Sequence, residues 1–181
     1  MGRAWFKPAT AKSRVGRAMQ NAILFTHLCL TMSELKKELH ALCAAFVEQR
    51  MANARQAITD AGQSANEDTK SSAGDKYETG REMMQQEKNR NMAQLTEANK
   101  LLVTLNRVGT GGRQEKAEEG SVVITNNGNF YIAISAGAIT YAGISYFAIS
   151  AASPIGAKLI GCKAGNEFAL NGKAYMVKEV E

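Results

Sequence analysis

The sequence predicts an α+β protein, in which an N-terminal antiparallel α-helical coiled-coil hairpin precedes a small antiparallel β domain with one short helix. Between residues 32 and 106, apolar side chains recur at steps of three and four, as on one face of a helix. From residue 120 onward, short β-prone runs alternate with turn residues. We therefore predict a hairpin over 32–106, a linker over 107–119 and a β domain over 120–181.

The first 31 residues carry basic side chains and no acidic ones. Their apolar run, AILFTHLCL, is too short to span a bilayer, and no small-residue cleavage site follows it. Met32 precedes SELKKELH, in which Ser33 is a suitable helix N-cap. We expect residues 1–31 to be an unstructured leader or an over-extended start, although a poor signal peptide or presequence has a similar composition.

The formal net charge of +5 comes from this leader, because its five basic residues (Arg3, Lys7, Lys12, Arg14, Arg17) account for the excess. The rest of the chain carries equal numbers of acidic and basic residues. A neutral body disfavours a general DNA-binding protein, whose affinity comes mainly from contacts between cations and phosphates.

Cysteine and histidine are too sparse for a disulfide framework, a zinc site or a histidine-based catalytic site. Cys29, Cys43 and Cys162 are odd in number and far apart, and His27 and His40 are the only histidines. We expect a cytoplasmic protein with no independent metal site and no catalytic residues of its own, with Cys162 as a small buried residue.

Two helices account for residues 32–106. The first carries an apolar stripe that shifts near residue 46, formed by Leu35, Leu39, Leu42, Phe46, Val47, Met51, Ala54, Ile58 and Ala61. The second follows a heptad register through Tyr77, Met84, Leu95, Ala98, Leu102 and Leu105, with Arg81, Lys88 and Asn91 as polar interruptions. Neither stripe is buried by its own helix, so the two helices should pack together as a rod of about 45 to 50 Å.

Turn signals divide the C-terminal region. SVVIT and FYIAIS flank TNNGN, and NEFAL and KAYMVKEV flank Asn171-Gly172, a pair preferred in two-residue hairpins. Between them lies SPIGAKLIG, in which Ser153 is placed to cap a short helix, Pro154 suits its first position and Gly161 can end it. The stretch RVGTGGRQEKAEEG is typical of a flexible junction.

The C-terminal motif resembles the bacterial GreA/GreB transcript-cleavage factors. The pattern I-S-x-x-S-P-I-G-x-x-L-I-G, followed by G-[ND]-x-F, is matched by Ile149, Ser150, Ser153, Pro154, Ile155, Gly156, Leu159, Ile160, Gly161, Gly165, Asn166 and Phe168. The resemblance covers residues 33 to 181. It implies a coiled-coil N-terminal domain followed by an FKBP-like C-terminal domain, which does not require isomerase activity.

The resemblance also implies a partner and a mode of action. Such factors bind at the rim of the RNA polymerase secondary channel and insert the hairpin, so that acids at its tip help to hold a second catalytic Mg²⁺ near the nascent RNA 3′ end. The polymerase then cleaves backtracked RNA, so the factor is not itself an enzyme. Ser153, Pro154 and Ile155 become candidate docking residues, and a monomer with no membrane association is expected.

The predicted tip, SANEDTKSSAGDKYETGR, supplies four candidate acids, Glu67, Asp68, Asp75 and Glu78. The family carries an Asp and a Glu three residues apart. Aligning Ser64-Ala65-Asn66 with the family's S-E-N puts Gly62 and Ala65 at these positions, and aligning Tyr77 and Arg81 with its Tyr and Arg puts Lys70 and Ala73 there, so neither alignment restores the pair. Ser64-x-x-Glu67 and Ser72-x-x-Asp75 also match capping boxes. Three functions stay open: a cleavage factor, a secondary-channel regulator that does not promote cleavage, and, less favoured, a small metabolic enzyme.

Overall fold

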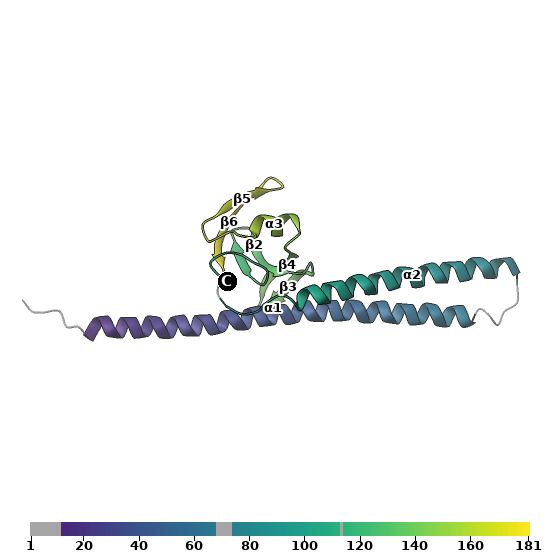
Figure 1. Cartoon of the computed structure of the whole chain (residues 1–181), viewed down its shortest axis with the longest axis horizontal. Coiled ribbons are helices and arrows are strands. Elements are labelled where there is room, and N and C mark those ends of the chain that lie inside the picture. Colours follow the sequence, from purple (N-terminus) through teal and green to yellow (C-terminus); the bar gives the residue numbers. More distant parts are fainter. Residues whose placement is uncertain (1–11, 68–73, 113) are drawn as a thin grey trace, which may run out of the picture.

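The computed structural model describes residues 12–67, 74–112 and 114–181, with side chains described for 34–63, 79–112 and 114–181. Two helices, α1 (Lys12–Glu67) and α2 (Gly74–Leu105), precede a six-stranded mixed sheet that carries one short helix. The class is α+β, as predicted. In Figure 1 the two helices lie side by side and run in opposite directions, and the sheet lies against α1 near the C-terminal end of α2.

Helix α1 begins at Lys12, well before the start that the sequence suggested. Residues 12–31, expected to be an unstructured leader, are helical, and Ser33 lies inside the helix instead of capping it. The stretch from Lys12 to Met32 contains no proline and a single glycine, Gly16, so nothing in it terminates a helix that is already formed. With 56 residues, α1 is about 84 Å long.

The buried stripe of α1 differs from the prediction at Phe46 and at Cys43. Leu39, Cys43 and Val47 are fully buried, whereas Phe46, which was placed on the stripe, is 38% exposed. Cys43 was not predicted to lie on the stripe, but steps of four from Leu35 reach Leu39, Cys43 and Val47 without any shift. On α2 the predicted register is confirmed at Ala98 and Leu105, which are fully buried.

The sheet follows the strand order β3-β4-β2-β1-β6-β5. Its strands are β1 (Val122–Thr125), β2 (Gly128–Ala133), β3 (Gly137–Tyr141), β4 (Ile144–Ser150), β5 (Glu167–Leu170) and β6 (Lys173–Val180). The short helix α3 (Pro154–Leu159) follows β4.

The prediction of an antiparallel sheet was wrong, because β2 and β4 pair in parallel. After β2 the chain passes to the edge of the sheet as β3, turns at Ala142-Gly143 and returns as β4, between β3 and β2. Sequence analysis did not identify the β3–β4 hairpin, although ITY and ISYF flank a two-residue turn. Both turn residues have positive φ, 49° at Ala142 and 78° at Gly143, and alanine is an unusual residue for that position.

The predicted β5–β6 hairpin is confirmed. Asn171 and Gly172 have φ values of 51° and 75°, as a two-residue turn of this type requires. Gly161 follows α3 with a φ of 81°, the left-handed conformation predicted for the end of that helix.

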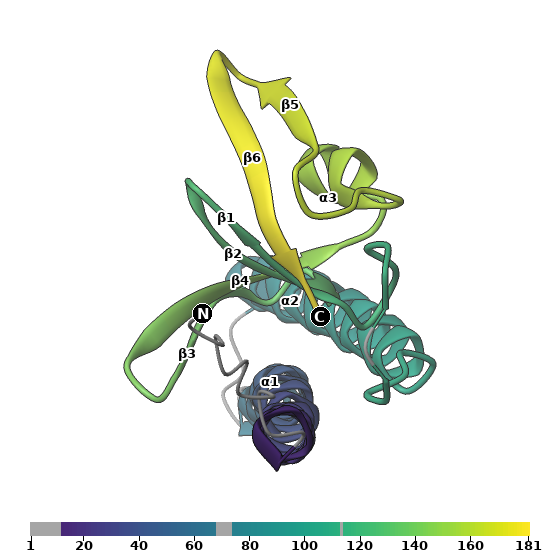
Figure 2. The same cartoon turned by 90° about the vertical axis from the view of Figure 1, so that its left-hand side faces the viewer.

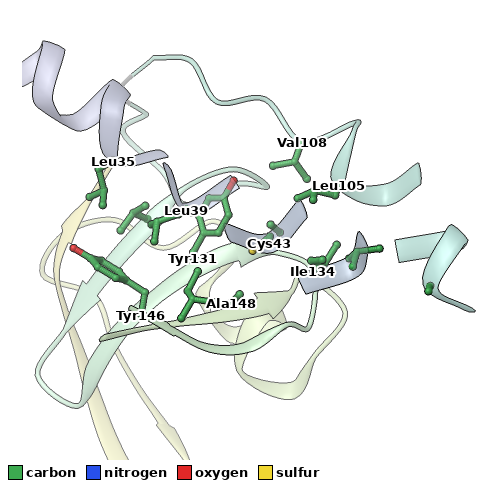
Figure 3. Packing of buried hydrophobic residues seen from close by; sticks show 14 of the residues in the cluster. Leu35, Leu39, Cys43, Leu105, Val108, Tyr131, Ile134, Tyr146 and Ala148 are labelled. Carbon is green, nitrogen blue, oxygen red and sulfur yellow. The ribbon is translucent and has the colours of Figure 1, made fainter. Parts of the chain in front are cut away.

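The two faces of the sheet bury different elements. Tyr131 and Tyr146 point toward α1 and join Leu39 and Cys43 in one core cluster (Figure 3). Phe130 and Ile132, whose side chains point the other way along β2, belong to a second cluster with Leu159 of α3. Figure 2, which looks along α1, shows the strands between α1 and α3.

The segment between α2 and β1, expected to be a flexible junction, is anchored to the fold at several points. Val108 and Ala117 are buried. The N–H group of Ala117 donates to the carbonyl of Cys162, and the N–H group of Gly161 donates to the carbonyl of Ala117, both at 2.8 Å. Buried Lys36 donates to the carbonyl of Gly112 at 2.7 Å.

Candidate functional site

The candidate tip acids lie where α1 ends and α2 begins. Glu67 is the last residue of α1, and Asp75 and Glu78 fall in the first turns of α2. These helix ends lie at the same end of the molecule, away from the sheet (Figure 1). Asp68 and the side chains of Glu67, Asp75 and Glu78 lie outside the described residues, so the prediction that these carboxylates converge stays a prediction.

The candidate docking turn, Ser153 to Ile155, begins α3. The Oγ atom of Ser153 accepts a hydrogen bond from the N–H group of Gly156 at 3.0 Å and donates one to the carbonyl of Ser150 at 2.7 Å. Pro154 occupies the start of the helix, where its missing N–H costs nothing. The predicted cap is therefore confirmed, and the turn is tied to the end of β4.

Gly156 is required because α3 lies very close to the end of β4. A Cβ atom at this position would collide with the carbonyl oxygen of Ser150 and lie 2.9 Å from Oγ of Ser153. Any larger residue would therefore push α3 away from β4. The glycine of the S-P-I-G motif fixes how closely the turn lies against the sheet.

The surface of this turn combines apolar and cationic side chains. Pro154 and Lys158 are exposed, Ile160 is 40% exposed, and Ile155 is half-buried against the cluster beneath α3. The hydroxyl group of Ser153 is used in capping the helix, so Pro154 and Ile160 supply the apolar contact area of this surface. A protein partner that binds here would meet an apolar ridge with one lysine.

A groove of about 650 Å³ lies between the segment before β1, the loop after α3 and the end of β6, and it was not identified from the sequence. It is lined by Gln114, Glu115, Lys163, Ala164, Lys178, Glu179 and Val180. Nζ of Lys163 and Oε2 of Glu115 form an ion pair at 3.3 Å between two of the lining segments. Because acids and lysines alternate, the groove has no dominant charge to select an anion or a cation.

The two cysteines with described side chains differ in their surroundings. Cys43 is fully buried, and burial raises the pKa of its thiol to about 11, so the thiol stays protonated at neutral pH. Burial, with a smaller effect of Cys43, also raises the pKa of Tyr131. Cys162, expected to be buried, is half-buried, and its Sγ donates to the carbonyl of Lys158 at 3.1 Å.

Within the residues that the structure describes, no group of three or more His, Cys, Asp or Glu side chains is arranged to hold a metal ion. Over those same residues, no helix has the length and apolar character needed to cross a membrane. Of the polar residues that interrupt the heptads of α2, Arg81 is exposed, while Lys88 and Asn91 are half-buried against α1.

Comparison with known proteins identifies no relative. No protein-family model matches the chain, and neither a curated protein nor a solved structure matches it significantly.

Proposed function

We propose that this chain is a bacterial cytoplasmic transcription factor of the GreA/GreB type, which binds RNA polymerase at the secondary channel. The observation that supports the proposal best is the separation of two features along one rod. The acidic ends of α1 and α2 lie at one end, and the S-P-I-G turn lies on the sheet beyond the other end of α2. A factor that reaches into a channel while holding its rim needs this separation.

In this proposal α1 and α2 form the antiparallel coiled-coil hairpin that enters the channel. Residues 74–105 of α2 are about 48 Å long, which sets the reach of the inserted part. Glu67, Asp68, Asp75 and Glu78 are the candidate acids that assist the polymerase in holding a second Mg²⁺. Carboxylate oxygens are the ligands that Mg²⁺ prefers, and a second metal ion stabilises the attacking and leaving oxygens during hydrolysis of RNA.

The sheet and α3 form the FKBP-like docking domain in this proposal. Ser153 holds the turn in place, and Pro154, Ile155 and Ile160 supply apolar contacts to the rim of the channel. The polymerase performs the chemistry, and this chain contributes carboxylates and position, so it is not an enzyme on its own.

A second function fits the same frame. The family's paired acids are absent from the tip in both alignments, which favours a regulator that occupies the channel without promoting cleavage. A small metabolic enzyme is less favoured, because catalysis by a nucleophile such as Cys162 needs a positioned base and the C-terminal half of the sequence contains no histidine.

A cleavage assay separates the first two functions. Full-length protein is added to a stalled, backtracked polymerase complex that contains Mg²⁺ and end-labelled RNA, next to the variants Glu67→Ala/Asp68→Ala and Asp75→Ala/Glu78→Ala. Faster RNA shortening that one double variant abolishes supports a cleavage factor and identifies its acids. Binding without shortening supports the regulator, and absence of polymerase binding contradicts both.

A matched pair of variants tests the docking surface. Pro154→Glu replaces an exposed apolar residue at the first position of α3, where an acidic side chain suits the helix dipole and should not unfold the helix. Lys173→Glu makes a change at an exposed position on the β5–β6 hairpin. We expect the first variant to weaken polymerase binding about tenfold or more and the second to leave it near wild type. Equal effects would contradict docking through α3.

A further inference from the structure

We propose that the helix pair has two parts of different stability, a packed base and a distal part that opens locally while the base and the sheet stay folded. The base comprises residues 34–51 of α1 and 95–105 of α2. The distal part comprises residues 54–63 and 79–91. This inference does not depend on the proposed function.

The base is held from two sides. Leu39, Cys43 and Val47 of α1 and Ala98 and Leu105 of α2 are fully buried. Residues of the sheet belong to the same core cluster, as Tyr131 and Ala148 do in Figure 3. Separating the two helices here would therefore open a core cluster to which the sheet also contributes.

The distal part has a thinner seam. From α1 it uses Ala54 and Ala61, which are buried but small, and half-buried Ile58. From α2 the facing positions are Met84, Lys88 and Asn91, which are all only half-buried. Little apolar area is removed from water, so the packing that favours closure is weaker than in the base.

Lys88 and Asn91 place polar side chains at positions of the seam where apolar residues would pack. Both occupy heptad positions, seven and four residues before Leu95, where an apolar residue would face the partner helix. Partial burial of an ammonium or amide group costs free energy unless a hydrogen bond replaces the lost water. A polar residue at such a position fixes the register of a coiled coil and lowers its stability.

Polar links between the helices follow the same division. In the base, Nε2 of His40 lies 3.1 Å from the carbonyl oxygen of Leu105, across the two helices. In the distal part, the side-chain hydrogen bonds of the described residues stay within one helix, as between Gln56 and Asp60 or between Gln85 and Asn89. Among the described distal residues, opening the pair therefore breaks no interhelical side-chain hydrogen bond of this kind.

Hydrogen–deuterium exchange of the full-length protein tests the proposal, because exchange reports local opening segment by segment. We expect amides of residues 79–91 to exchange at least roughly tenfold faster than those of residues 95–105. Replacing both polar residues, Lys88→Leu/Asn91→Leu, should slow distal exchange by a factor of about ten and leave the base unchanged. Lys88→Met alone should act in the same direction.

A control separates seam packing from helix propensity. Gln86→Leu/Arg90→Leu also replaces one cation and one amide by leucine on α2, but at exposed positions. The proposal requires this control to change distal exchange much less than the seam variant does. Equal protection of the two parts in the wild-type protein, or equal effects of the two double variants, would overturn it.

Discussion

Raising the pH from 8 to 10 should destabilise this protein through one thiol at the contact between α1 and the sheet. Cys43 is fully buried in that core, and burial raises the pKa of its thiol from 9.0 to about 11. Between these values the unfolded chain releases a proton that the folded chain keeps. Stability is therefore complete below pH 9 and falls as the pH rises toward 11.

The size of the effect follows from the two pKa values. At pH 10 the unfolded thiol is about nine-tenths ionised and the folded thiol about one-tenth, which corresponds to a loss of about 1 to 1.4 kcal/mol in the free energy of unfolding. Tyr131, whose pKa is also raised, adds about 0.4 kcal/mol in the same direction, because half of the unfolded tyrosine is ionised at pH 10.

Urea unfolding under reducing conditions at pH 8 and pH 10 measures this loss. Cys43→Ala removes the thiol and adds a packing defect at both pH values, so the difference between the two pH values isolates ionisation. We expect the variant to lose about 1 kcal/mol less than the wild type over this interval. Cys162→Ala, which leaves Cys43 in place, should behave as the wild type does. Equal pH dependence of Cys43→Ala and the wild type would refute the buried position of this thiol.

Three further predictions concern stability, each measured by urea unfolding at pH 7. Gly156→Ala should destabilise the protein by about 1 to 3 kcal/mol, since its Cβ would collide with the carbonyl of Ser150. Gly62→Ala, with open space around the new Cβ, should stabilise it by about 0.5 to 1 kcal/mol. Effects of the same sign for both variants would contradict this reasoning. Leu39→Ala should lower the free energy of unfolding by about 2 to 5 kcal/mol, and Phe46→Ala clearly less, because Phe46 is partly exposed. A larger loss for Phe46→Ala would support the stripe predicted from the sequence. Tyr131→Phe should stabilise by roughly 1 kcal/mol, because the buried hydroxyl has no hydrogen-bond partner among the described residues, and a loss of stability would reveal a partner.

The predictions that succeeded rest on local chemistry. Ser153 and Pro154 specify the start of a short helix, and Asn171-Gly172 specifies a two-residue turn, because each needs only its immediate neighbours. The heptad positions at Ala98 and Leu105 likewise follow from one helix meeting one partner. In these cases the sequence pattern contains the physical cause of the structure.

The predictions that failed depend on distant parts of the chain. The parallel pairing of β2 with β4 arises because β3 takes the edge position, and no local signal distinguishes this from a simple meander. Phe46 was assigned to the stripe because it lies four residues after Leu42, but the core cluster shared with the sheet includes Leu39, Cys43 and Val47 instead. Which face of α1 is buried depends on where the sheet packs, and Tyr131 of the sheet shares its cluster with Cys43.

The same packing ties the α3 turn to the base of the helix pair. Tyr131 and Ile132 are neighbours in β2 whose side chains enter opposite clusters, one against α1 and the other beneath α3. Because packed interiors resist compression, we expect a displacement of α3 to strain β2 and, through it, the contact with α1. The sheet and the base of the helix pair therefore keep fixed positions, whereas the distal part of the pair can open. If the proposed function holds, the rim contact sets the direction of the rod, and the weakly packed distal part adjusts to the channel.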